Sequence, residues 1–259
     1  MQQNRRGLDF LPSVGPMGRL DQEATQSLAS LHWTRSDVRS GDFIRADEGI
    51  SVIGAGWAAQ YRDLPEGGRQ MVSLLLPGDL CSFAFLTERE LNSAPLTALT
   101  PTTIWSLPIE AFLGAGDARN SVVTSVLAAM DIDHAILEEH LIAIGSLNAV
   151  GRLARFLCEL QYRLGATDAP FELPLSQSRI GEYLCLSSVH VNRTFQALRR
   201  QGLIETRGKR LVILDAARLA ALGAFNAAYL AHDSAAMHSG GSLRSASASS
   251  ASLVDPSPL

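Results

Sequence analysis

The chain has 259 residues, of which 46% are hydrophobic, and a formal net charge of −4. This length suits one large or two modest domains, and this apolar content is enough for a packed core. No apolar run reaches the ~18 residues that a membrane span requires. No apolar block follows Arg5 and Arg6, as it would in a secretory signal. We therefore expect a cytoplasmic protein with no membrane partner.

The sequence lacks the common motifs of catalytic and metal-binding sites. The three cysteines, Cys81, Cys158 and Cys185, are far apart and form no C-x-x-C pattern, which suits a reducing compartment. The phosphate-loop, nucleophile-elbow and zinc-protease motifs are all missing, and Gly54 with Gly56 lacks the third glycine of a dinucleotide fingerprint. We expect no enzyme activity, no metal site and no cofactor.

From about Asp42 to Leu107 the sequence alternates between short apolar runs and turn residues. The runs at 51–53, 57–62 and 71–76 are separated by glycine, proline and acidic residues, and 96–107 continues the pattern. Strands at such regular spacing predict an all-β sandwich or roll. We assign it to residues 20–115, after an N-terminal tail at 1–19.

The next segment has the pattern of one long helix, over 116–148. Its apolar positions follow a strict 4-3-4-3 spacing, which is typical of a seam between two helices. We interpret the seam as a dimer contact, and packing within the chain is the alternative. His134 lies inside the seam as a register-setting polar residue, whereas His140 faces elsewhere on the helix. The seam consists of Val123, Leu127, Met130, His134, Leu137, Leu141, Ile144 and, at its end, Asn148.

Composition divides the rest of the chain into three parts. Arg152–Leu164 reads as a further helix, ended by Gly165. Ser176–Leu214 holds seven basic and two acidic residues, a net charge of +5, which leaves −9 for the remainder of the chain. A basic patch on an acidic body is typical of contact with a polyanion. Residues 232–259 are rich in Ser, Ala and Gly, and we expect them to be disordered.

The basic segment has the order of a winged helix-turn-helix. A helix opens at Ser176, and a turn at 185–187 precedes a second helix over Ser188–Gln201. Ser187 or Ser188 caps the second helix, and Gly202 ends it. Two strands, 203–206 and 211–214, follow and are joined by a basic connection, which makes a wing.

Helical geometry assigns the faces of the second helix. At about 100° per residue, Val191, Phe195 and Leu198 share the buried face. Arginine bonds guanine, Asn or Gln bonds adenine, and valine meets a thymine methyl group, so the opposite face suits base reading. A charged, solvated surface helix is the alternative. The predicted base-reading residues are Ser188, Val189, His190, Asn192, Arg193 and Gln196, and the predicted phosphate contacts are Ser176, Arg199, Arg200, Arg207, Lys209 and Arg210.

With this helix-turn-helix, the chain resembles the Crp/Fnr family of bacterial transcriptional regulators. The resemblance extends from about Leu20 to Leu222. The segment Leu173–Ile204 is similar to the family's helix-turn-helix signature, and Leu76–Leu80 resembles the turn that opens its effector cassette. The resemblance implies an α+β fold with a cyclic-nucleotide-binding-like β-roll at 20–115, a dimerisation helix at 116–148 and a winged helix-turn-helix domain at 149–222. It also implies a homodimer on a palindromic operator in double-stranded DNA, with RNA polymerase as a partner if the protein activates transcription.

The resemblance also bears on which residues read DNA and which signal is sensed. The family's base-reading positions fall on Ser188, Val189 and Arg193, of which only Arg193 keeps the residue type of the cAMP-responsive members. The glutamate that holds the ribose is replaced by Phe83, and the arginine-serine pair that holds the phosphate by Asn92-Ser93. We therefore expect no cyclic nucleotide to bind.

The sequence leaves several other modes of control open. No cysteine precedes Cys81, so the cysteine-rich N-terminus of an iron–sulfur sensor is missing. Cys185 lies beside the reading helix and is either a redox switch or a small buried hydrophobe. The roll as an effectorless scaffold is a further alternative. A different class of function is a ligand-binding signalling module whose winged helix contacts proteins.

Overall fold

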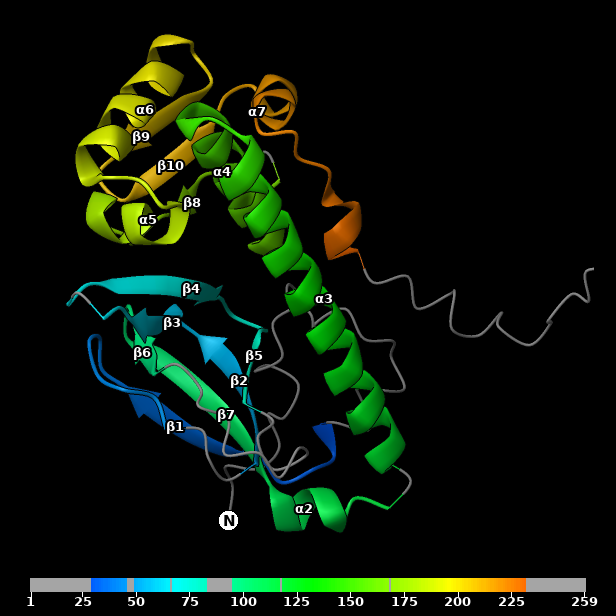
Figure 1. Cartoon of the computed structure of the whole chain (residues 1–259). Coiled ribbons are helices and arrows are strands. Elements are labelled where there is room, and N and C mark those ends of the chain that lie inside the picture. Colours follow the sequence, from blue (N-terminus) through cyan, green and yellow to red (C-terminus); the bar gives the residue numbers. More distant parts are fainter. Residues whose placement is uncertain are drawn as a thin grey trace, which may run out of the picture.

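A computed structural model describes residues 29–45, 49–65, 67–82, 95–116, 118–167 and 169–231. The predictions for the tails at 1–19 and 232–259, and for Phe83, Asn92 and Ser93, lie outside the described residues. A strand-rich part and a smaller helical part are joined by one long helix (Figure 1).

The strand-rich part is a roll of two antiparallel sheets. One sheet has the order β1-β7-β2-β5 and the other β4-β3-β6. Their bounds are β1 Thr34–Val38, β2 Gly49–Ala55, β3 Ala58–Asp63, β4 Arg69–Leu75, β5 Leu80–Ser82, β6 Leu96–Ala98 and β7 Thr102–Pro108.

The predicted start of the strands at about Asp42 is wrong, because β1 begins at Thr34. The sequence of β1 has no apolar alternation and most of it is exposed. It is a strand because it pairs with β7 over its whole length, from Thr34 opposite Ser106 to Val38 opposite Thr102. Pairing between segments so far apart in the chain leaves no local signal.

The roll is closed by buried aliphatic side chains and by a tight bend. Ile50 and Val52 of β2 and Leu107 of β7 are fully buried. The sequence pattern indicated a turn at Gly54 and Gly56, but Gly54 belongs to β2. The turn between β2 and β3 lies at Gly56, which has φ of +84° and where a Cβ would lie 2.3 Å from the Pro101 carbonyl oxygen. Only glycine fits there without strain.

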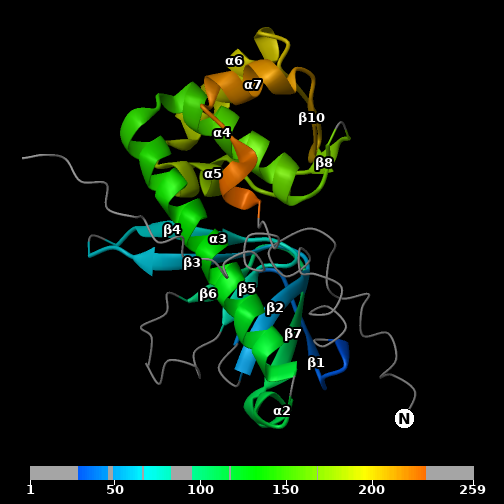
Figure 2. The same cartoon turned by 90° about the vertical axis from the view of Figure 1, so that its right-hand side faces the viewer.

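A short helix, α2 (Ile109–Leu113), leads into the long helix α3 (Ala118–Ser146). α3 runs from the far end of the roll up to the helical part, as both views show (Figures 1 and 2). Its inward stripe includes Val122, Val126 and Ala129 against the roll, and Ile132 and Ile136 further along.

The end of α3 and the start of the next helix, α4 (Ala149–Arg163), differ from the predicted bounds. Asn148 is not part of the seam helix: its side-chain oxygen accepts a hydrogen bond from the Gly151 N–H at 3.0 Å and caps α4. The expected start at Arg152 was therefore three residues late. A cap of this kind satisfies a backbone donor that the helix leaves unpaired.

α4 is the central helix of the C-terminal part. Leu153, Leu157 and Leu160 have no exposed surface, and the other elements pack around them. These elements are β8 Phe171–Glu172, α5 Gln177–Leu184, α6 Ser188–Arg200, β9 Ile204–Arg207, β10 Arg210–Ile213, α7 Ala216–Leu222 and the 3₁₀ helix η3 Ala227–Leu230. The sequence did not reveal β8, which has two residues and pairs with β10 across about forty positions of chain.

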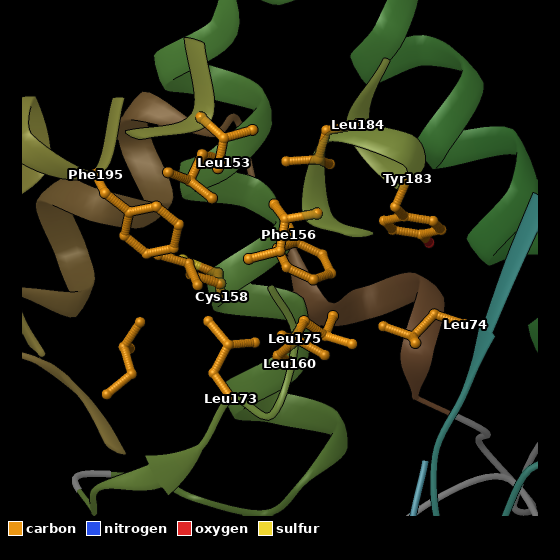
Figure 3. Close-up of a cluster of buried hydrophobic side chains, with 14 of the residues drawn as sticks. Leu74, Leu153, Phe156, Cys158, Leu160, Leu173, Leu175, Tyr183, Leu184 and Phe195 are labelled. Carbon is orange, nitrogen blue, oxygen red and sulfur yellow. The ribbon is translucent and has the colours of Figure 1, made fainter. Parts of the chain in front are cut away.

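One hydrophobic cluster continues from the roll into the C-terminal part. Leu74 of β4 and Leu99 belong to the same buried cluster as Leu160 of α4 and Tyr183 of α5. In Figure 3, Leu74 and Tyr183 lie on the same side of this cluster. The roll and the C-terminal part are thus packed against one another. In the described ranges, no helix is long and apolar enough to cross a membrane.

Candidate nucleic-acid interface

Two serine caps, one at the start of each helix, and one glycine fix the geometry of α5 and α6. The Ser176 hydroxyl oxygen accepts from the Arg179 N–H at 3.2 Å, and Ser187 accepts from the His190 N–H at 3.2 Å. Ser187, rather than Ser188, therefore caps α6. A Cβ at Gly181 would lie 2.3 Å from the Leu186 carbonyl oxygen, so the two helices approach closely only because residue 181 is glycine.

The buried face of α6 matches the predicted one. Val191 and Leu198 have no exposed surface, and Phe195 is 7% exposed. Thr194 is buried as well, and its hydroxyl donates to the His190 carbonyl oxygen at 2.8 Å. The prediction omitted Thr194, although it lies three residues after Val191 and four before Leu198, which places it on the same stripe.

The opposite face of α6 is open to solvent at the outer end of the molecule (Figure 1). Val189 is 59% exposed on this face. The Gln196 side-chain amide donates to the Asn192 oxygen at 3.3 Å, so these two side chains restrain one another. Of the predicted base-reading residues, Asn192 is half-buried and the others, Ser188, Val189, His190, Arg193 and Gln196, are exposed.

The predicted wing is a two-residue hairpin between β9 and β10, with Gly208 and Lys209 at its tip. Gly208 has φ of +62°, which such a tight turn requires. Two of the predicted phosphate contacts already have partners within the chain. The Arg207 Nε donates to Glu205 at 2.9 Å, and the Arg199 guanidinium donates to the Thr206 hydroxyl at 3.0 Å. Ser176, Arg199, Arg200, Arg207, Lys209 and Arg210 are all exposed around α6 and the wing.

The three cysteines differ in their surroundings. Cys185 is exposed and has φ of 55° and ψ of 47° at the end of α5. The alternative that Cys185 is a small buried hydrophobe is therefore wrong. Burial raises the pKa of Cys158 to about 12, and desolvation raises the pKa of Cys81 far above its usual value. Both of these thiols remain protonated at neutral pH and are therefore weak nucleophiles.

The predicted seam of α3 faces away from its own chain. Leu127 is 57% exposed, Leu137 48% and Leu141 71%. The alternative of packing within the chain is therefore wrong for these residues. Met130 is also exposed, Val123 and Ile144 are half-buried, and the exposed His134 lies 3.2 Å from the Glu138 carboxylate.

His140 lies off the seam, as the sequence indicated, and faces α5. Its ring stacks on Tyr183 of α5, with ring centroids 4.2 Å apart and planes at 21°. Desolvation lowers its pKa, so the neutral form is favoured. Within the ranges that the structure describes, no group of three or more His, Cys, Asp or Glu residues could hold a metal ion.

A cavity of about 310 Å³ lies where β3 and β4 of the roll meet α3 and α5. Gln60 and Ser73 from the roll, Asp133 from α3 and Tyr183 from α5 are among its lining residues. Burial, together with the nearby charge of Asp79, raises the pKa of Asp133 to about 7. This carboxyl group therefore changes its charge near neutral pH.

Two family models match this chain. A Crp-like helix-turn-helix domain matches residues 151–222, and a cyclic nucleotide-binding domain matches residues 39–118. The first covers α4 to α7, and the second covers most of the roll.

Curated relatives and solved structures agree with these matches. The nitrogen fixation regulation protein FixK of Bradyrhizobium diazoefficiens is 29% identical over 200 residues, which covers 73% of this chain and 82% of that protein. The transcriptional activator protein FnrL of Cereibacter sphaeroides is 30% identical over 219 residues, covering 78% and 84%. The structure of FixK2 from Bradyrhizobium japonicum has a TM-score of 0.58 at 23% identity, covering 76% of this chain and 100% of that one. The chain belongs to the Crp/Fnr family of DNA-binding transcriptional regulators.

Proposed function

We propose that the protein acts as a cytoplasmic homodimer that reads a palindromic operator, with α6 of each protomer in the major groove. The observation that carries this proposal is the solvent-facing side of α6, which presents Arg193 between Val189 and Gln196 at the outer end of the molecule. The exposed seam of α3 supports a second copy, because an apolar stripe of this length is seldom left in water.

The roles of individual residues follow from where they lie. Arg193 is the residue best placed to bond guanine in a bidentate manner, and Asn192 with Gln196 supplies amides for adenine. Ser188, Val189 and His190 occupy the first turn of α6, which lies deepest in the groove in helix-turn-helix proteins. Phosphate contacts come from Ser176 at the cap of α5, from Arg199 and Arg200, and from the wing residues Arg207, Lys209 and Arg210.

The signal that controls the protein is a separate part of the proposal. We expect no response to cyclic nucleotides, and we propose redox control through Cys185. Its thiol is exposed in the turn beside α6, so an oxidised sulfur would add bulk and charge where phosphates approach. Several relatives are named transcriptional activators, which supports contact with RNA polymerase in an activating role.

The test is binding to duplex DNA as a function of salt. The full chain is first used to select bound duplexes from a random pool, and the selected sites are then titrated between 50 and 200 mM salt. A regulator that neutralises several phosphates should select inverted repeats and lose about 10³-fold or more in affinity over this range. A module whose winged helix contacts proteins would select no repeat and show no such slope, and this result would overturn the proposal.

A further inference from the structure

A buried ionic cluster joins the roll to the DNA-binding domain. Arg163, at the end of α4, donates from Nη1 to Glu159 at 3.0 Å and from Nη2 to the Leu74 carbonyl oxygen at 3.1 Å. The same Nη2 also donates to the carboxylate of Asp79. The side chains of Arg163 and Asp79 are only 6% and 3% exposed, so the pair is shielded from water.

Asp79 connects this cluster to the roll. It lies in the turn Leu76–Leu80, and its Oδ2 also accepts from the Leu76 N–H at 2.6 Å. The carboxylate therefore holds the shape of the turn and binds α4 at the same time. The same turn opens the segment in which related proteins hold an effector, so a distortion of the turn would pass directly to α4.

The other side of the cluster connects to α3. Glu159 accepts a hydrogen bond from the Tyr229 hydroxyl at 2.9 Å. Tyr229 belongs to η3, and the neighbouring Leu230 is buried against Ile132 and Ile136 of α3. The cluster thus ties together the roll, the central helix of the DNA-binding domain and the dimerisation helix.

The cluster also determines where α6 lies. α3 and α4 are separated only by Leu147 and Asn148, and Arg152 of α4 donates to the Ile144 carbonyl oxygen of α3 at 2.6 Å. These two helices are therefore tied to one another at their junction, and the cluster adds the connection of α4 to the roll. α6 packs on α4 through the buried cluster that contains Phe195 and Phe156, and it follows α4 when α4 moves. Contacts of α5 with the roll also hold the DNA-binding domain in place. Arg179 donates to the Leu99 carbonyl oxygen at 3.3 Å, but this hydrogen bond is only partly buried.

We infer that Arg163 is a positioning residue for DNA binding, which holds the DNA-binding domain against the roll through Asp79 and so sets the separation of the two reading helices in the dimer. The inference rests on the proposed reading of palindromes by a homodimer. It concerns the spacing of the half-sites, whereas the side chains on α6 determine the sequence of each half-site.

The test uses the full chain and a set of duplexes that carry two copies of the selected half-site, with the centre-to-centre distance changed by up to 3 base pairs in either direction. Since half-sites one helical turn apart lie 10–10.5 base pairs from centre to centre, a change of 2 base pairs rotates one half-site by about 70°. The wild-type protein should favour one distance over its neighbours 2 base pairs away by about tenfold or more, as expected for a loss of about 1.4 kcal/mol.

The variant must remove the cluster without leaving a buried charge. Arg163→Met alone leaves the carboxylates of Asp79 and Glu159 without their cation, and such a change is strongly destabilising. The triple variant Asp79→Asn/Glu159→Gln/Arg163→Met replaces the charges by neutral groups of similar shape and should fold. Its amide oxygens can still accept from the Leu76 N–H and the Tyr229 hydroxyl.

The expected result is a spacing preference that falls below about threefold in the triple variant, while the base preference of a single half-site is unchanged. Arg163→Lys, which keeps a cation at this position, should retain the wild-type optimum. Arg193→Ala is the control and should alter base preference without moving the spacing optimum. A folded triple variant with the wild-type spacing profile would overturn the inference, as would an equal loss of affinity at every spacing. If the wild-type protein itself shows no optimum, the proposed dimeric reading fails instead.

Discussion

Arg193 lies near the middle of α6, on its exposed face. Its position follows from its neighbours, because Val191, Thr194 and Phe195 are drawn into the core and leave residue 193 outside. This much could be predicted from the 3.6-residue period. What the period could not give is the partnering of nearby cations, such as Arg207 with Glu205, which depends on the hairpin.

We expect Arg193→Ala to cost about 1–3 kcal/mol in operator binding and to relax base preference at one position of each half-site. The reason is the loss of a bidentate contact to a base edge. Lys209→Ala, at the tip of the wing, should weaken binding to all sequences alike and reduce the salt slope by about one. Competition binding with operators substituted at each position checks both variants. Unchanged specificity in Arg193→Ala would show that the reading face is assigned wrongly.

The exposed thiol of Cys185 provides a second test at a single residue. Hydrogen peroxide oxidises an exposed thiolate to a sulfenic acid and is itself reduced to water, and the added oxygen then lies beside the DNA-facing turn. We expect peroxide to weaken operator binding by the wild-type protein and a thiol reductant to restore it. Cys185→Ser should be insensitive, although it retains Cys81 and Cys158. Equal sensitivity of the two proteins would exclude a role for Cys185.

The long helix α3 carries two apolar stripes, one buried within the chain and one exposed. One stripe, with Val122, Val126 and Ile136, is buried against the rest of its own chain. The other, with Leu127 and Leu141, faces solvent and is the proposed dimer seam. The sequence analysis singled out the second stripe and omitted the first, although Val122, Val126 and Ile136 also follow the helical period.

We expect Leu141→Glu to separate the dimer into monomers. Residue 141 occupies an a-type position, where the two copies of the helix would oppose each other, so two buried carboxylates would repel one another. Ile142→Glu is the matched control: Ile142 is 55% exposed on the same turn but lies off the seam. Analytical ultracentrifugation of both variants measures the oligomeric state, and Ile142→Glu should remain a dimer. A dimeric Leu141→Glu variant would contradict the seam.

The whole molecule is organised by contacts between parts that are distant in the sequence. Arg163 meets Asp79, and Arg155 of α4 pairs with Glu139 of α3 and donates to the Ala224 carbonyl oxygen at 2.8 Å. Such contacts connect the roll, the long helix and the segment after α7 into one body. The cavity that contains Asp133 lies where β3, β4, α3 and α5 of this body meet.

Asp133 should make the stability of the whole molecule depend on pH. Its pKa is about 7 in the folded protein and ~3.9 in the unfolded chain. Between these two values the folded state binds a proton that the unfolded state does not, so the free energy of unfolding falls as pH rises from about 4 to about 7. We expect Asp133→Asn to gain at least about 1.4 kcal/mol relative to wild type between pH 5 and pH 8, which corresponds to one pKa unit.

Urea denaturation of both proteins at pH 5 and pH 8 measures this difference. Asp131→Asn, which removes an exposed carboxylate from the same helix, controls for the loss of one negative charge. Parallel pH dependences of Asp133→Asn and wild type would show that the carboxyl group is not desolvated in the folded state.

Features that depend only on neighbouring residues could be predicted from the amino-acid sequence. A serine cap at 187 or 188, the stop at Gly202, the buried stripe of α6 and the 4-3-4-3 stripe of α3 all follow from propensities and periods within a few turns of chain. Features that depend on distant partners became known from the fold alone: the polar strand β1, the exposure of Cys185 and of the α3 seam, and the contact of Asp79 with Arg163 across 84 positions. A pair interaction between remote residues has no period, so it becomes visible only when the fold brings the two side chains together.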